Sequence, residues 1–230
     1  MKSIQIFCRN FFEWEGYKDY FKGLTNTATI AVFGLLIGFI LACVIAFVKL
    51  LPSKKVPILI AKKACDTYVA LFRGTPMVVQ LLLLHFAVFP AIGLNISSVT
   101  EAVFIFGLNS AAYMSEMLRS GINAVDKGQM EAGRSLGLSY GTTMLRIILP
   151  QAIKNILPTL GNEFIALIKE TSVVTFIAVV DVTKALSSIA ESTYEYFVPY
   201  IVLALTYLII VLFITWLIKI MERSLQKNER

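Results

Sequence analysis

Long apolar runs alternate with short polar connections along this chain of 230 residues. The runs cover about residues 25–48, 74–93, 99–118, 156–180 and 196–218. A helix needs about 20 predominantly apolar residues to cross the hydrocarbon core of a bilayer, and each run approaches that length. The pattern therefore predicts an all-α membrane protein with five transmembrane helices.

The remaining segments flank or extend these runs. Residues 1–22 are amphipathic and rich in aromatic side chains, so we expect them to lie at the membrane interface, ahead of a transmembrane domain formed by residues 23–220. Residues 57–72 extend the second run as a partly amphipathic helix. Gly74-Thr75-Pro76 should break that helix, because proline cannot continue the hydrogen-bond ladder. Residues 221–230 form a polar tail.

Composition agrees with a membrane protein and narrows its chemistry. Hydrophobic residues make up 57% of the chain and charged residues 16%, against about 45–50% and 25% in soluble domains. The basic residues behind the net charge of +6 are spread between the apolar runs, which argues against nucleic-acid binding. Cys8, Cys43 and Cys65 match neither a disulfide framework nor a metal-ligand spacing. We therefore expect packing roles for the cysteines, and no metal or cofactor in this chain.

Lysine and arginine gather in alternate connections. They occupy the first connection, the third connection and the tail: Lys49, Lys54, Lys55, Lys62 and Lys63; Arg119, Lys127, Arg134, Arg146 and Lys154; Lys219, Arg223, Lys227 and Arg230. The second connection, residues 89–98, has none, and the fourth, residues 181–196, has only Lys184. Basic loops stay on the cytoplasmic side. The bias predicts an outside N-terminus, an inside C-terminus and a cytoplasmic third connection.

That third connection, residues 119–155, contains a spaced motif. Glu131-Ala132-Gly133 is followed after three residues by Gly137, and after nine more by Ile147, with Leu149-Pro150 one residue further on. The spacing resembles the cytoplasmic "EAA" loop of the membrane subunits of bacterial ABC importers, with Gly133 in place of the second alanine. We call residues 119–155 the docking loop, because the resemblance implies that an ATPase subunit binds there.

Each motif residue has a physical reason to be at such an interface. Ala132, Gly133 and Gly137 are small enough for a short helix to press into a groove on a partner. Leu136 supplies an apolar anchor, and Glu131 supplies a charge that can pair with a basic residue. The alternative is an amphipathic loop helix that Asp126 caps and Gly137 ends, with no partner.

Three further segments extend the resemblance to about residues 20–220. Phe72 to Pro76, Asn109 to Glu116 and Gly161 to Ser172 all resemble polar amino-acid permeases of the histidine, glutamine and arginine type. The resemblance implies the type I, MetI-like fold in the bacterial cytoplasmic membrane. It implies as partners a second permease chain, two ATPases, an extracytoplasmic binding protein and lipid. ATP and Mg²⁺ would be bound by the ATPases, because no Gly-Lys-Ser/Thr phosphate loop is present in this sequence.

Two of these segments give candidate residues along the transport path. Arg73, Gly74, Thr75 and Pro76 form either a gate or a simple helix bend in which Arg73 reaches lipid headgroups. The Asn109 and Gly161 segments contribute Asn109 and Asn162 as candidate substrate contacts.

The fourth run holds the strongest substrate-site candidates. Glu163 and Glu170 are seven residues apart, so they lie within about 20° of each other around a helix. They are about 10 Å apart along its axis. A carboxylate at bilayer depth costs about 2.5–3.5 kcal/mol on insertion scales, so the pair requires a cation or a watery cavity. Related permeases often have an uncharged residue in place of Glu163, so we expect a basic substrate. The alternative is a structural pair neutralised by Lys169 or by another helix.

These observations lead to one functional hypothesis with named competitors. The chain is expected to be the permease subunit of an ABC amino-acid importer, not an enzyme, and to carry arginine, lysine or histidine. An importer of glutamine or cystine is the first alternative. A proton-coupled secondary transporter that uses Glu163 and Glu170 as a relay is the second, but it leaves the docking loop unexplained.

Overall fold

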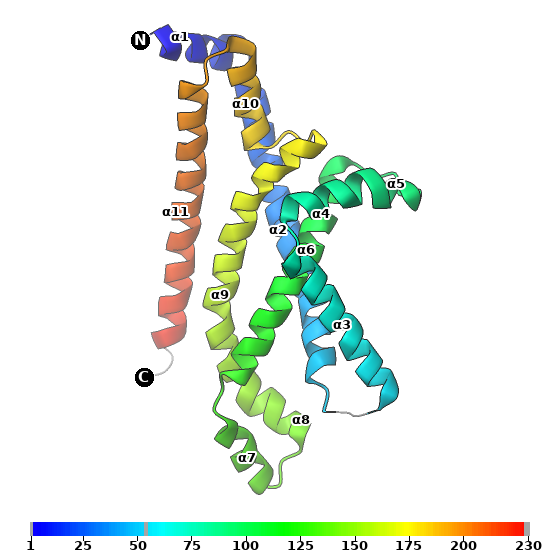
Figure 1. Ribbon diagram of the computed structural model, residues 1–230. Helices are drawn as coiled ribbons and strands as arrows, with labels where there is room; N and C mark the ends of the chain where they lie inside the picture. The colour runs from blue at the N-terminus through cyan, green and yellow to red at the C-terminus, as the bar shows by residue number, and fades with distance from the viewer. Residues whose placement is uncertain (1, 53–54, 228–230) are drawn as a thin grey trace.

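The computed structural model describes residues 2–52 and 55–227, with side chains described as far as residue 223, and the regular elements in these residues are all helical (Figure 1). The all-α prediction is confirmed for this part of the chain. Lys54 and Arg230, which the orientation argument counted, lie outside the described residues, as does the side chain of Lys227.

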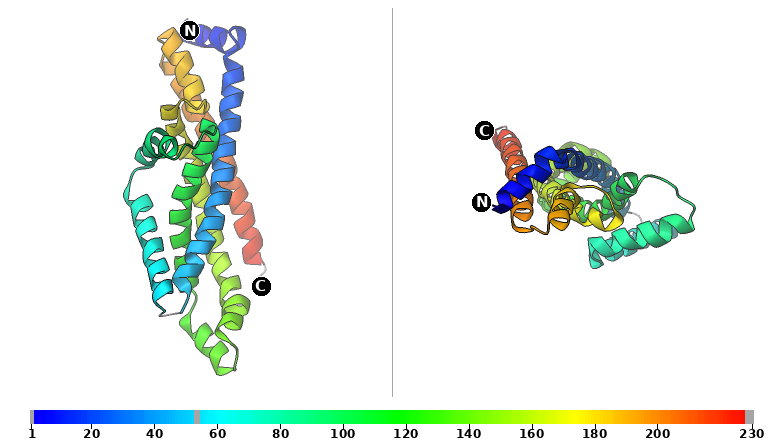
Figure 2. Two further views of the ribbon diagram at one scale, coloured as in Figure 1. Left: turned by 90° about the vertical axis from the view of Figure 1, so that its right-hand side faces the viewer. Right: turned by 90° about the horizontal axis from the view of Figure 1, so that it is seen from above.

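Two long helices frame the bundle. Helix α2 runs from Gly16 to Leu50 and α11 from Phe197 to Lys227. By length and apolarity, these are the two described helices that can each cross a membrane alone. Helices α6 (Ser98–Asn123) and α9 (Leu149–Glu170) run beside them (Figure 2). The predicted number of spans stays a prediction.

The predicted second span is not a straight helix along the bundle. Helix α3 (Val56–Gly74) ends at the expected break, and α4 (Met77–Leu83) continues through η2 (Leu84–Val88) into α5 (Phe89–Ala91). The second part is bent by 109° from α3 and lies across the bundle (Figure 1). If the bent pair is one span, the number of candidate spans rises to three among the described residues.

The fourth connection is also different from the prediction. Helix α9 passes into a tighter 3-10 helix, η4 (Thr171–Ile177), and residues 182–193, expected as part of a loop, form α10 (Val182–Thr193). Asp181 caps α10 by accepting hydrogen bonds from the backbone N–H groups of Thr183 and Lys184, at 3.1 and 2.8 Å. The buried face of α10 packs against the start of α2 and against α11.

Close packing of α2 against α6 forms the centre of the bundle. A Cβ on Gly34 would lie 3.1 Å from the Cβ of Phe106, and one on Gly38 would lie 2.8 Å from the Cβ of Ser110. Gly34 and Gly38 are thus the small residues, four apart, that allow two helix backbones to approach within a membrane. This approach places Ser110 at the centre of the bundle.

The two ends of the bundle differ in character. Helix α1 (Lys2–Cys8) and η1 (Arg9–Glu13) lie at one end beside α10, where Phe7 and Phe11 pack against its apolar face (Figure 1). The docking loop forms the other end, through α7 (Lys127–Ser135), α8 (Tyr140–Thr143) and η3 (Met144–Ile148). The C-terminal end of α2 and the start of α3 also lie toward this second end (Figure 1).

Candidate functional site

Glu163 lies half-buried on α9 and faces α6. Its Oε1 accepts a hydrogen bond from the Ser110 hydroxyl at 3.1 Å. Glu170, two turns further along the same helix, is the last residue of α9 and is exposed in the isolated chain. The two carboxylates therefore lie on the same side of α9. Glu163 is hydrogen-bonded to α6, and Glu170 is accessible to another molecule.

Basic side chains of this chain do not pair with these acids in the residues that the structure describes, where the salt bridges lie elsewhere. Lys169, which the alternative named as a neutralising residue, is exposed and forms no salt bridge in the described residues, although its charge acts on its neighbour Glu170. Within the described part of the chain, α9 thus has two acidic groups without a salt-bridge partner. A cationic ligand or water has to compensate them.

The two asparagines do not join the carboxylates. Asn109 is 5% exposed, and its side-chain N–H donates to Oε1 of Gln80 at 2.8 Å. Asn162 is exposed, and as the neighbour of Glu163 it lies about 100° further around α9. Of the four predicted substrate residues, Glu163 contacts α6 and Asn109 is bonded to Gln80. Glu170 and Asn162 are exposed.

The residues of the helix break lie around the start of α4. Arg73 places its guanidinium carbon 5.4 Å from the centre of the Tyr113 ring on α6, which is cation–π geometry. Thr75 donates its hydroxyl to the carbonyl oxygen of Leu71 at 2.8 Å, and no heavy atom lies within 4 Å of a Cβ built on Gly74. Pro76 is the N-cap residue of α4, and its missing N–H interrupts the hydrogen-bond ladder between α3 and α4.

Within the docking loop, α7 has the boundaries that the alternative interpretation expected. Asp126 accepts from the N–H of Gly128 at 2.6 Å, and Gly137 follows the last turn in the left-handed region, with φ of +80°. The N–H of Leu138 reaches the Gly133 carbonyl and that of Gly137 reaches the Arg134 carbonyl, both at 3.1 Å. This pair of bonds is a Schellman motif. A well-capped helix is thus presented at the tip of the molecule.

The surface of α7 suits contact with another protein. Leu136 is 80% exposed, and Glu131 and Ala132 are exposed beside it. Gly133 is buried instead and packs against α8. A Cβ at this position would lie 2.5 Å from a methyl carbon of Thr143, which is too close. The small residue at position 133 is required by packing inside this chain. Contact with a partner, which the sequence analysis gave as the reason for a small residue at position 133, is therefore not needed to explain Gly133.

A cluster of charges ties three helices together at this end of the bundle. Lys49 at the end of α2 bonds to Asp66 of α3 at 2.8 Å and to Glu116 of α6 at 2.6 Å. Arg119 holds the other oxygen of Glu116 at 2.6 Å. The sequence argument used Lys49 and Arg119 for orientation alone. It missed the bonds of Lys49 because Asp66 and Glu116 are distant in sequence, whereas Glu116 and Arg119 are only three residues apart.

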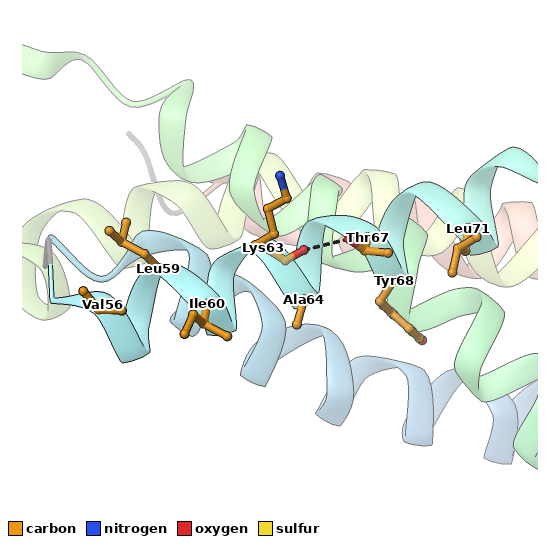
Figure 3. Close-up of a pocket in the computed structure, with 8 residues that line it drawn as sticks. All are labelled: Val56, Leu59, Ile60, Lys63, Ala64, Thr67, Tyr68 and Leu71. Atoms are coloured by element: carbon orange, nitrogen blue, oxygen red, sulfur yellow. Dashed lines mark hydrogen bonds between the residues drawn. The ribbon is translucent and has the colours of Figure 1, made fainter.

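The hollow drawn in Figure 3 is separate from these residues. It is lined by α3 alone, from Val56 to Leu71, with mostly apolar side chains along one open face. None of the predicted site residues contributes to it. The carboxylates on α9 remain the better candidate for binding a polar ligand.

Comparison with known proteins places this arrangement in a family. The family model described as "Binding-protein-dependent transport system inner membrane component" matches residues 34–227. The chain is 42% identical to the arginine transport system permease protein ArtQ of Bacillus subtilis, over 90% of this chain and 93% of that protein. It is 38% identical to the putative glutamine transport system permease protein GlnP of Rickettsia bellii, over 89% and 91%.

Solved structures agree on the fold. The chain superposes with a TM-score of 0.83 on a chain of a crystal structure entitled "Crystal structure of an amino acid ABC transporter with histidines", at 39% identity, covering 92% of this chain and 96% of that one. A chain of the MetNI methionine ABC transporter in an inward-facing conformation gives a TM-score of 0.65 at 15% identity, covering 93% and 97%. The second likeness shows the fold alone.

Proposed function

Since this chain belongs to the binding-protein-dependent transport system inner membrane components, as the permease subunit of a polar amino-acid ABC transporter, we propose that it carries basic amino acids along α9. It is an inner-membrane component and is not itself an ATPase. A transporter of this family requires an ATPase and a binding protein as partners. Membership of a binding-protein-dependent transport family argues against the secondary-transporter alternative.

The observation that supports a basic substrate is the unpaired acidity of α9. Glu163 and Glu170 have no salt-bridge partner among the described residues, yet both lie on a helix at the centre of the bundle. An amino acid that carries two cationic groups can compensate both carboxylates at once. Glutamine, with one cationic group, compensates only one, and the similar identities to permeases named for arginine and for glutamine leave the choice to this chemistry.

The assembly that would use this site contains two permease chains and two ATPases. The exposed side of Glu170 faces the pathway between the two permeases, and Asn162 lines the same pathway. A binding protein delivers the amino acid from outside. We assign the break from Arg73 to Pro76 to a gate, because the chain turns there by 109° into the segment that lies across the bundle.

Coupling to ATP passes through the docking loop. Leu136 and Glu131 bind in a groove of the ATPase, so closure of the two ATPases moves α7 and, through η3, the start of α9. The inward and outward states then differ in their contacts at one interface, which is what transmits the free energy of ATP binding.

Neutralising each carboxylate separately tests the site. Glu163→Gln removes one charge-assisted contact, which is worth about 1.5–3 kcal/mol, or about 10- to 150-fold in affinity. We expect it to weaken binding of arginine and lysine far more than binding of glutamine. Glu170→Gln should weaken both classes, because we assign it the α-ammonium group that all amino acids share. Equilibrium binding to the assembled transporter in nanodiscs measures both effects.

The control for this test is Glu13→Gln, which neutralises an exposed acid on η1 at the far end of the bundle. Exchanged phenotypes would reverse the pose and keep the site. Native affinities for both substrates in both variants, at equal expression, would show that the acids on α9 are structural. Preferential binding of glutamine by the native transporter would favour the first alternative substrate.

A further inference from the structure

The helix break deprives several backbone carbonyls of their helical partners, and those of Phe72 and Thr75 are two of them. In a continuous helix the carbonyl of Phe72 would accept from the N–H of residue 76, but residue 76 is proline and has none. The carbonyl of Thr75 would accept from the N–H of Val79, which instead bonds to the Pro76 carbonyl at 3.0 Å. In a membrane an unsatisfied carbonyl costs several kcal/mol, so both need another donor.

One side chain supplies that donor to both carbonyls. The amide nitrogen of Gln80 lies 2.8 Å from the Phe72 oxygen and 2.9 Å from the Thr75 oxygen. It also lies 2.9 Å from the Thr75 hydroxyl. Gln80 is 6% exposed, so water does not compete readily for these bonds. A glutamine in an otherwise apolar run thus closes the break that Pro76 opens.

The other end of the same amide reaches α6. Its carbonyl oxygen accepts from the side chain of Asn109 at 2.8 Å, and Asn109 is followed directly by Ser110, which donates to Glu163. Hydrogen bonds thus connect the break to Asn109 and connect Ser110 to α9, and these two residues are neighbours in the backbone of α6. Gln80 is the residue in it that contacts both the break and α6.

We propose that Gln80 is a positioning residue of the transport path, which fixes the helix break against α6 and thereby sets the position of the Glu163 carboxylate. The inference rests on the proposed function, in which Glu163 contacts the substrate. Gln80 itself does not touch the substrate. Its effect on binding is transmitted through Asn109 and Ser110, so it exists only while the carboxylate at position 163 is present.

This dependence gives a test that a merely structural role would not pass. Gln80→Met removes the amide and fills a similar volume. In the assembled transporter in nanodiscs, we expect it to raise the dissociation constant for arginine by up to about tenfold, because a displaced Glu163 carboxylate loses part of its charge-assisted bond to the substrate. In the Glu163→Gln background it should cause no further rise. Gln5→Met, on the exposed side of α1, is the matched control and should leave both values unchanged.

Two milder variants protect the test against loss of folding. Gln80→Glu places a carboxyl group in a buried site, where the neutral form is favoured, so it keeps one O–H donor and one acceptor. We expect it to restore most of the arginine affinity that Gln80→Met loses. Asn109→Ser leaves the break closed by Gln80 but shortens the side chain that reaches it. This variant should also weaken arginine binding only when Glu163 is present.

The outcomes separate the two proposals. If Gln80→Met and Asn109→Ser weaken binding by the same factor with and without Glu163, the positioning role is overturned and the substrate site stands. If Glu163→Gln alone binds arginine as the native transporter does, the substrate site itself is wrong, and the positioning role is overturned with it.

Discussion

Gly133 and Gly137 stand four residues apart in the docking loop, and each lacks a side chain for a different reason. Gly137 has φ of +80°, a backbone conformation that costs other residues about 1–2 kcal/mol, but no heavy atom lies within 4 Å of an added Cβ. Gly133 has an ordinary helical backbone, and it is the Thr143 side chain that leaves no room. The space around Gly137 is therefore available to a partner.

A bulky residue at position 137 should weaken binding of the ATPase without unfolding the permease. We expect Gly137→Trp to reduce the fraction of ATPase that co-purifies with the permease, and to reduce uptake in proportion, because the indole fills the space that the partner needs. Gly93→Trp is the matched control: Gly93 also has a positive φ, of +68°, and open space around it, but it lies outside the docking loop. Equal ATPase recovery from the two variants would remove the docking role of Gly137.

At the scale of elements, the close contact between α2 and α6 stabilises the bundle. The added Cβ of Gly38 would lie 2.8 Å from the Cβ of Ser110, closer than real Cβ atoms come. A larger side chain there must push the two helices apart at the level where Ser110 bonds to Glu163. Packing and the candidate site thus depend on the same small residue.

We therefore expect Gly38→Leu to destabilise the permease by about 1–3 kcal/mol, the usual cost of overpacking a well-packed contact. It should also weaken arginine binding by disturbing Ser110. Thermal unfolding of the purified transporter measures the first effect. Ile40→Phe, which adds volume on the exposed side of α2, is the control and should leave the unfolding temperature unchanged. An unfolding temperature for Gly38→Leu that equals the control value would contradict the packing argument.

Apolar runs, helix breakers and helix caps predicted the elements that depend mainly on residues close together in the sequence. Apolar runs located α2, α6, α9 and α11, and the Gly74-Thr75-Pro76 and Asp126 signals located the helix break and the start of α7. The sequence could not predict the direction of α4 and α5 after the break, since that depends on contacts with α6 and η4. It missed α10 because a short polar connection was assumed, although its apolar positions repeat with helical spacing.

The candidate site was predictable to a similar extent. The spacing of Glu163 and Glu170 follows from helix geometry alone, so their common side of α9 needed no tertiary information. Ser110 is far away in sequence from Glu163, and Asn109 from Gln80, so only the structure brings these pairs together. An amide in an apolar run, four residues after a proline, is the signal that could have indicated Gln80.

The whole molecule has two unlike ends, which bears on its orientation in the membrane. The docking loop and the cluster of Lys49, Asp66, Glu116 and Arg119 lie toward one end, and α1 and α10 lie at the other (Figure 1). The end of α2, the start of α3 and the docking loop, which carry basic residues of the first and third connections, lie toward the first of these ends (Figure 1). An ATPase can reach the loop only if that end is cytoplasmic, so orientation and function depend on each other.

Cysteine labelling tests the orientation directly. The native Cys8, Cys43 and Cys65 are first replaced by serine or alanine, and single cysteines are then introduced at two exposed positions: Asn95, in the connection between α5 and α6, and Gly141, on α8, where nothing crowds a new side chain.

We expect Asn95→Cys to react with a membrane-impermeant maleimide in intact cells. Gly141→Cys should react only after the membrane is opened, because the positive-inside bias places the docking loop in the cytoplasm. Labelling of Gly141→Cys from outside, with Asn95→Cys protected, would invert the chain. The exposed Leu136 would then face away from ATP, and the proposed coupling through α7 would be impossible.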